Sequence, residues 1–171
     1  KTKILITSHC FFDNPHCYGG LLFTDFYEWL SFLAEKSHST DYDWYIKPHR
    51  DFLPGTIEAL NLFISKFKNM KIINPETSFH QLKKEGIINV LTCYGSVGHE
   101  LPMLGFNVIN AGYNPHISFN FNVNCSSKNE YSKIIDNLND LELNKNLDEI
   151  DKFYYIHNIQ INGDLFSQDG K

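Results

Sequence analysis

The sequence has few cysteines, and they form no framework for disulfides or zinc. The four cysteines stand at positions 10, 17, 93 and 125, and no two of them make a Cys-x-x-Cys pair. Such spacing is typical of reduced thiols in a cytoplasmic protein. A chain of 171 residues with 42% hydrophobic residues can bury a core without disulfides. We therefore predict one cytoplasmic domain without disulfide bonds.

Long apolar runs and an excess of basic residues are also missing. No run approaches the roughly 20 apolar residues that cross a bilayer, and the N-terminus lacks the apolar core of a signal peptide. The formal net charge is -5, whereas nucleic-acid-binding domains usually carry a basic face. These absences predict a soluble protein that binds no nucleic acid.

Fingerprints of common cofactors and metals are absent as well. No Gly-x-Gly-x-x-Gly follows the first predicted strand and no Walker pattern occurs, which argues against dinucleotide and nucleoside-triphosphate enzymes. Asp41-Tyr42-Asp43 matches the sequence of a metal-binding Asp-x-Asp motif, but it precedes a strand instead of ending one. We interpret it as a solvated turn and expect neither a metal nor a cofactor.

Short apolar runs alternate with helical patterns along most of the chain. Runs rich in Ile, Leu and Val predict five strands, at 3–8, 43–47, 70–74, 88–92 and 107–110. Helical spacing of apolar residues separates them, at 21–35, 56–67 and 77–85 and just before the fifth strand. The alternation predicts an α/β fold: a Rossmann-like, doubly wound parallel sheet of about five strands with helices on both faces.

The last third of the chain follows a different pattern. Residues 114–124 alternate like a strand or an extended loop, whereas 128–143 and 147–161 are amphipathic helical patterns. We expect a single domain, residues 1–171, in which residues 127–171 form a helical C-terminal tail.

Polar residues follow three of the predicted strands. In an open α/β sheet the ligand lies across the carboxyl ends of the strands, where the strand order reverses. The candidate site residues are His9, Asp13 and His16 after the first strand, Lys47 and His49 after the second, and Tyr94, Gly95, Ser96, Gly98, His99 and Glu100 after the fourth.

The loop after the fourth strand has the composition of an anion-binding turn. Gly95 and Gly98 would let a ligand approach the backbone, the Ser96 hydroxyl could donate a hydrogen bond, and a helix N-terminus favours phosphate. The alternatives are a plain tight turn and, for Glu100, compensation of the helix dipole without any ligand.

Four stretches of the chain resemble one protein family. Residues 96–100 (SVGHE), followed by 104–108 (LGFNV), are similar to the C-terminal, nucleotide-sugar-binding half of GT-B glycosyltransferases, most closely bacterial capsule polysaccharide biosynthesis proteins. Residues 9–16 (HCFFDNPH), 19–30 (GGLLFTDFYEWL) and 44–49 (WYIKPH) agree with that family. The resemblance covers residues 3 to 125, and the chain departs from it at Arg50, where the family usually has Pro.

The resemblance implies a glycosyltransferase of capsule or surface polysaccharide synthesis that works without a metal. Its partners would be a nucleotide-sugar donor, a glycan acceptor and a membrane polysaccharide assembly complex bound peripherally. His49 would face the nucleotide phosphate, and Glu100 would contact ribose or sugar hydroxyls. A GT-B active site lies between two such domains, and the chain begins at Lys1 rather than Met, as expected of a piece of a longer protein or a processed chain.

The loop after the first strand has two interpretations. His9, Asp13 and His16 could face the interdomain cleft and touch donor or acceptor as catalytic residues, or Asp13 and Asn14 could form a structural Asx-Pro turn. His9, Cys10, His16 and Cys17 could also bind zinc, but their spacing is not that of structural zinc sites.

Two other functions fit the same pattern. A sugar-nucleotide 2-epimerase has the same fold and a similar phosphate loop, and a non-catalytic module could bind the nucleotide sugar within an assembly complex. A labelled nucleotide sugar separates the enzymes, because epimerisation needs no acceptor.

Overall fold

The computed structural model describes residues 1–9, 11, 20–51, 53–141 and 146–160. Its strands are β1 (Thr2–Ser8), β2 (Tyr42–Pro48), β3 (Met70–Ile72), β4 (Asn89–Thr92), β5 (Asn107–Asn110) and β6 (Val123–Asn124). Its α-helices are α1 (Phe26–Ser39), α2 (Thr56–Lys66), α3 (Phe79–Lys84), α4 (Val97–Met103), α5 (Lys128–Asp136) and α6 (Leu147–Tyr154). A 3-10 turn, Leu138–Asp140, follows α5, and a π-helical turn, Tyr155–Gln160, continues α6.

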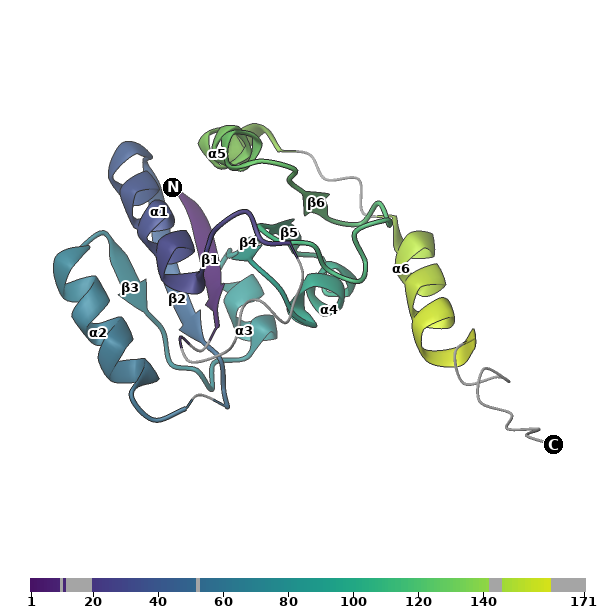
Figure 1. The fold of residues 1–171 in the computed structure, drawn as a ribbon, viewed down its shortest axis with the longest axis horizontal. Helices are drawn as coiled ribbons and strands as arrows, with labels where there is room; N and C mark the ends of the chain where they lie inside the picture. The colour runs from purple at the N-terminus through teal and green to yellow at the C-terminus, as the bar shows by residue number, and fades with distance from the viewer. Residues whose placement is uncertain (10, 12–19, 52, 142–145, 161–171) are drawn as a thin grey trace.

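The described strands form one parallel sheet in the order β3-β2-β1-β4-β5-β6 (Figure 1). The chain builds outward from β1 to β3, then returns to the other side of β1 and continues through β4 to β6. This is the doubly wound order, and the direction of winding reverses between β1 and β4. The predicted fold class is therefore confirmed, with six strands instead of about five.

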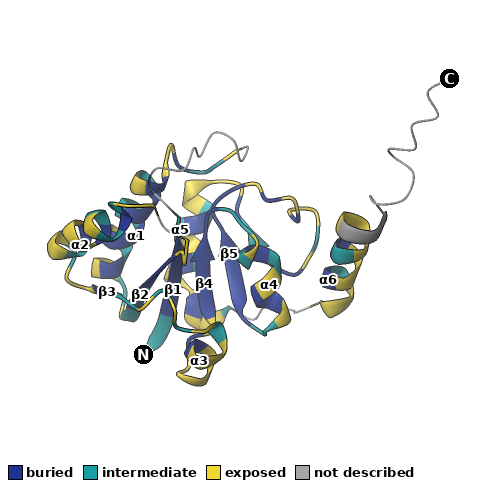
Figure 2. Ribbon diagram, turned by 90° about the horizontal axis from the view of Figure 1, so that it is seen from below, coloured by how far each residue is buried: buried dark blue, intermediate teal, exposed yellow. Residues whose placement is uncertain are grey.

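Two apolar cores cover the two faces of the sheet, which is why the strands are buried in Figure 2. Side chains alternate along each strand, so that Ile4 and Ile6 of β1 enter one core and Leu5 enters the other. The first core packs against α1, α2 and α5, and the second packs against α3 and α4. Helices thus cover both faces, as the sequence predicts.

The predicted helix at 21–35 is displaced toward the C-terminus. Helix α1 begins at Phe26, because the Asp25 carboxylate caps it by accepting the Glu28 amide at 2.7 Å. Leu21 instead forms an antiparallel bridge with Gly112. Apolar residues keep the same helical spacing in 21–25 as in α1, so the spacing alone did not show that the helix begins after Asp25.

The last third of the chain departs from the prediction in two places, whereas α6 and the π-helical turn after it follow the predicted helix 147–161 as far as Gln160. In residues 114–124 only Val123 and Asn124 join the sheet, and α5 ends at Asp136 instead of continuing to 143. Helix α6 lies beside α4 at the edge of the molecule (Figure 1), where Ile150 and Phe153 pack on Phe121.

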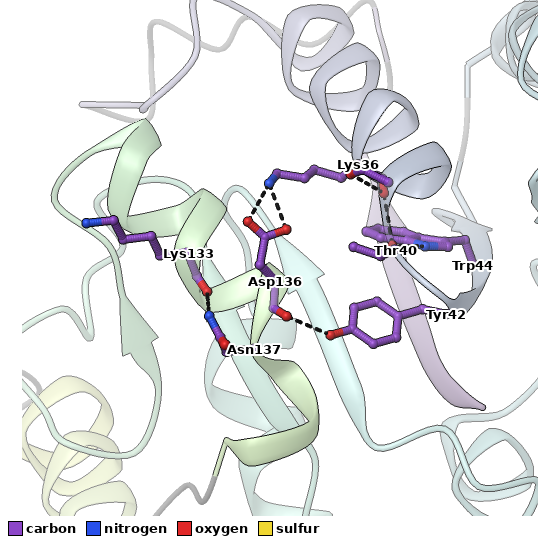
Figure 3. Close-up of polar contacts among 8 residues, drawn as sticks. Lys36, Thr40, Tyr42, Trp44, Lys133, Asp136 and Asn137 are labelled. Atoms are coloured by element: carbon purple, nitrogen blue, oxygen red, sulfur yellow. Dashed lines mark hydrogen bonds and ion pairs between the residues drawn. The ribbon is translucent and has the colours of Figure 1, made fainter.

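Helix α5 is tied to α1 and β2 by polar contacts at the edge of the first core (Figure 3). Lys36 of α1 reaches the Asp136 carboxylate at 2.7 and 2.8 Å, and the Tyr42 hydroxyl donates to the Asp136 carbonyl at 3.1 Å. Deeper in the core, the Trp29 indole donates to the Tyr131 hydroxyl at 3.0 Å. Among the described residues, no helix is long and apolar enough to cross a membrane.

Candidate functional site

A cavity of about 740 Å³ lies at the carboxyl edge of the sheet, where the winding reverses between β1 and β4. It brings together six of the predicted residues, from the ends of three strands: His9, Lys47, His49, Tyr94, Gly95 and Ser96. Glu100, a seventh, lines it from the first turn of α4. Two other hollows lie over α5 and at the amino ends of β1 and β2, and neither contains a predicted residue.

The floor of the cavity is a row of polar side chains on neighbouring strands. Thr7 of β1 pairs with Lys47 of β2, and the register of β1 and β4 places Thr92 beside Thr7. All three are buried and lie on the α3 and α4 side of the sheet. Thr92 in turn pairs with Asn110 of β5, and Asn110 with Asn124 of β6. The strands are thus apolar along their length and polar at their carboxyl ends, where a row of polar side chains faces the cavity and the loops around it.

Lys47 is a buried cation in this row, with 5% of its surface exposed. Its Nζ donates to the Pro75 carbonyl and lies 5.4 Å from the centre of the Phe79 ring. Burial lowers the pKa of Lys47, although the charge of Glu76 opposes this effect. No carboxylate of the described residues pairs with Lys47. A bound anion would therefore supply the missing counter-charge.

His49 and Arg50 stand at the mouth of the cavity. His49 Nδ1 accepts the Asp51 amide at 3.1 Å, which leaves Nε2–H as the donor available to a ligand. Arg50 forms an exposed ion pair with Glu76 at 3.0 Å. Together with Lys47 they give the cavity three basic side chains, whereas its carboxylates, Asp51 and Glu100, are exposed.

The loop after β4 has the backbone geometry that its composition predicts. Gly95 has a φ of +119°, which a side chain would strain, so glycine suits this turn. Ser96 is exposed, and its hydroxyl caps none of the amides of α4. Ser96 and Glu100 both line the cavity, and Glu100 also lies in the first turn of α4, where an acidic side chain compensates the helix dipole.

His9 holds this loop from the β1 side. Its Nε2 accepts the Tyr94 amide at 3.3 Å, and its ring stacks on Phe26 with centroids 4.3 Å apart. Burial, and to a lesser extent the nearby His49, lowers the pKa of His9 to about 4. His9 is therefore neutral at physiological pH and accepts a hydrogen bond at Nε2.

Asn114 holds the same loop from the opposite side. Its Oδ1 accepts the Gly95 amide at 3.1 Å, and its Nδ2 donates to the carbonyls of Cys93 at 3.2 Å and Gly112 at 3.1 Å. Only 3% of Asn114 is exposed. Sequence reasoning missed this residue, although the Asn-Pro pair at 114–115 marks a turn and could have drawn attention to it.

Gly98 and His99 lie on the side of α4 away from the cavity. A Cβ on Gly98 would stand 2.4 Å from Cε1 of His116, so this glycine permits close packing of the His116 ring. His99 packs on Phe153 and hydrogen-bonds the Tyr154 hydroxyl at 2.7 Å. Gly98 thus connects α4 to the 114–124 stretch and His99 connects it to α6, and neither residue lines the cavity.

Two of the three predicted catalytic residues, Asp13 and His16, lie outside the described residues, as do Cys10 and Cys17. Within the part of the chain that the structure describes, no group of three or more His, Cys, Asp or Glu side chains could hold a metal ion. Basic side chains, hydroxyls and a glycine turn are what the described cavity offers a ligand, and they suit a phosphate group.

Comparison of the chain with protein-family models, curated proteins and solved structures found no match in any of the three.

Proposed function

We propose that this protein is the donor-binding part of a glycosyltransferase that acts in capsule or surface polysaccharide synthesis and binds a nucleotide sugar in the cavity. The observation that carries the proposal is the position of Lys47, His49 and Ser96 around one cavity at the switch point of a doubly wound sheet. The resemblance of residues 44–49 and 96–108 to capsule polysaccharide biosynthesis proteins supports it.

In this function the basic residues stabilise the leaving group. An acceptor hydroxyl attacks the anomeric carbon, the bond from that carbon to the phosphate oxygen breaks, and negative charge develops on the nucleotide phosphate. Lys47, Nε2–H of His49 and the Ser96 hydroxyl would stabilise that charge, a task that metal ions perform elsewhere. Glu100 would hold ribose or sugar hydroxyls, and the base that takes the acceptor proton would come from a second domain.

One observation favours a second candidate, a module that binds nucleotide sugars without transferring them. Of the predicted catalytic residues, His9 is the one that the structure describes, and its Nε2 already accepts the Tyr94 amide. This arrangement suits a residue that holds the binding loop. The same binding site would then serve an assembly complex instead of a reaction.

Calorimetric titration of UDP and CMP into the protein and three variants tests the site. We expect Ser96→Ala, His49→Ala and Glu100→Gln each to weaken nucleotide binding by about 1.5–3 kcal/mol, the usual contribution of a hydrogen bond to a charged group. Glu100→Gln should leave the affinity for inorganic phosphate unchanged, because Glu100 contacts the nucleoside or sugar.

Two matched variants control for effects on the fold. Glu58 occupies the first turn of α2 as Glu100 occupies that of α4, and His80 is an exposed histidine on α3. Glu58→Gln and His80→Ala should leave nucleotide affinity unchanged. Equal affinities in all five variants and the parent protein would place the site elsewhere, and the absence of binding at millimolar nucleotide would refute the proposed function.

A further inference from the structure

One buried hydroxyl in the cavity has no hydrogen-bond partner. Ser8 is the last residue of β1 and is 7% exposed, and its Oγ contacts no donor or acceptor among the described residues. An unsatisfied buried hydroxyl is normally avoided in a folded protein, because the lost hydrogen bonds to water are not replaced. Since Ser8 lines the cavity, a ligand there could supply the missing partner.

The neighbouring hydroxyls show that Ser8 differs from its surroundings. Thr7 and Thr92 line the same cavity and are also buried. Their hydroxyls, however, donate to main-chain carbonyls, that of Thr7 to Leu91 at 3.3 Å and that of Thr92 to Tyr94 at 3.2 Å. The proton of Ser8 alone among these three hydroxyls remains available to a ligand.

The backbone of Ser8 lies level with the segment that carries the basic residues Lys47 and His49. In the register of β1 and β2, Ser8 pairs with Pro48, so it lies between Lys47 and His49 along the neighbouring strand. Lys47 has no carboxylate partner among the described residues, and His49 presents Nε2–H. Side chains alternate along a strand, so the Ser8 side chain lies on the α1 side of the sheet, opposite to those of Thr7 and Lys47. Ser8 and Lys47 thus line the same cavity from the two sides of the strand ends. A phosphate group between them could contact both, whereas a sugar or base hydroxyl would leave the Lys47 charge uncompensated.

We propose that the Ser8 hydroxyl donates a hydrogen bond to a phosphoryl oxygen of the bound nucleotide, so that the phosphate lies at the carboxyl ends of β1 and β2. This inference rests on the proposed function and adds a contact that the sequence did not indicate. It also orients the ligand: the phosphate lies at the strand ends between Ser8 and Lys47, and the nucleoside lies toward the rim.

The test is titration of the full chain and its Ser8→Ala variant with pyrophosphate, UDP, CMP and uridine. We expect Ser8→Ala to weaken binding of the three phosphate-bearing probes by about 10- to 100-fold and to leave uridine binding unchanged. Its melting temperature should not fall, because the substitution removes a buried group without a partner. The control is Ser37→Ala, which removes a buried serine hydroxyl that donates to the Ala34 carbonyl at 2.6 Å and does not line the cavity. Its pyrophosphate affinity should stay within a factor of about three of the parent value.

The outcomes separate this inference from the proposed function. If UDP or CMP binds the parent protein and Ser8→Ala equally, the Ser8 contact is refuted and the function stands. If uridine binding weakens as much as UDP binding, the hydroxyl contacts the nucleoside and the inference is wrong. If pyrophosphate binds but the nucleotides bind no better, the function is refuted and the pyrophosphate affinity of Ser8→Ala decides the inference. If no phosphate-bearing probe binds the parent protein, both are refuted.

Discussion

At the scale of single residues, the neutral state of His9 links the stability of the loop after β4 to pH. The unfolded chain takes up a proton on this histidine near its ordinary pKa of 6.5, whereas the folded protein does so only at a pKa of about 4. The unfolded state therefore binds more protons between these values, so the stability that His9 contributes is complete above pH 6.5 and declines as the pH falls toward 4.

We expect the free energy of unfolding to fall by about 2 kcal/mol per such histidine between about pH 8 and about pH 5. His116, whose pKa burial and the nearby His99 lower to about 4, adds a loss of the same sign. Urea denaturation from about pH 8 to about pH 5 measures this fall in the free energy of unfolding. His9→Gln keeps an acceptor for the Tyr94 amide but does not titrate, so it should flatten the curve, and an unchanged pH dependence in this variant would contradict the assignment.

Residues near one another in sequence were easier to recognise as parts of the site than residues that folding brings together. Gly95, Ser96 and Glu100 form one local pattern whose turn and helix follow from their types. Asn114 and Ser8 reach the same loop and cavity from distant positions, and neither residue type is unusual at the end of a strand. Their importance follows from the hydrogen bonds they make or lack, which depend on how the strands are paired.

At the scale of elements, the buried hydrogen bond between Trp29 and Tyr131 joins α5 to α1. Tyr131→Phe would leave the Trp29 indole N–H buried without an acceptor, so we expect a loss of about 1–3 kcal/mol in the free energy of unfolding. Tyr42→Phe is the matched control. It also removes a phenolic hydroxyl that contacts α5, but at an exposed hydrogen bond, and should cost less than about 1 kcal/mol.

Urea denaturation of the two variants at neutral pH measures the difference. Equal losses would show that the buried indole finds another acceptor, and the anchoring of α5 through Tyr131 would then be refuted. Nucleotide affinity should change in neither variant, because both positions lie away from the cavity.

The positions of helices and strands were predictable where the spacing of apolar residues agrees with residues that end an element, such as glycine. The fifth strand, 107–110, matches β5 at both ends because Gly105 stops the preceding helix and a short apolar run follows. At α2 the helix begins at Thr56 as predicted, and Gly55, at a φ of +89°, is the residue that caps it. Helix starts depend on one side chain or one backbone angle, which periodicity does not encode.

At the scale of the whole molecule, the chemistry of the cavity predicts nucleotide binding without a metal ion. EDTA in excess should leave the affinity for UDP and CMP unchanged, because basic side chains and hydroxyls would contact the phosphate directly. Calorimetric titration before and after chelation measures this. A fall in affinity that added Mg²⁺, Mn²⁺ or Zn²⁺ reverses would show that a metal takes part.

The doubly wound sheet was predictable from the sequence because strands alternate with helices and crossovers between parallel strands are right-handed. The polar row across the strand ends was not predictable. It depends on the register by which Thr7 meets Lys47 and Thr92 meets Asn110, and that register is set by the packing of both cores. The site is thus partly local sequence pattern and partly a product of strand pairing.

The strand order also constrains how the protein is made. β1 is synthesised first and lies in the middle of the sheet, so β2 and β3 can pair on one side of it early, while its other edge waits for β4. During translation this second edge of β1 therefore has no partner strand until Asn89–Thr92 has left the ribosome. Some eighty residues are added to the chain between Ser8 and that point. An unpaired apolar edge invites pairing with other chains. The nascent chain should thus be most prone to aggregate just before the half of the cavity formed by Gly95, Ser96 and Glu100 is added.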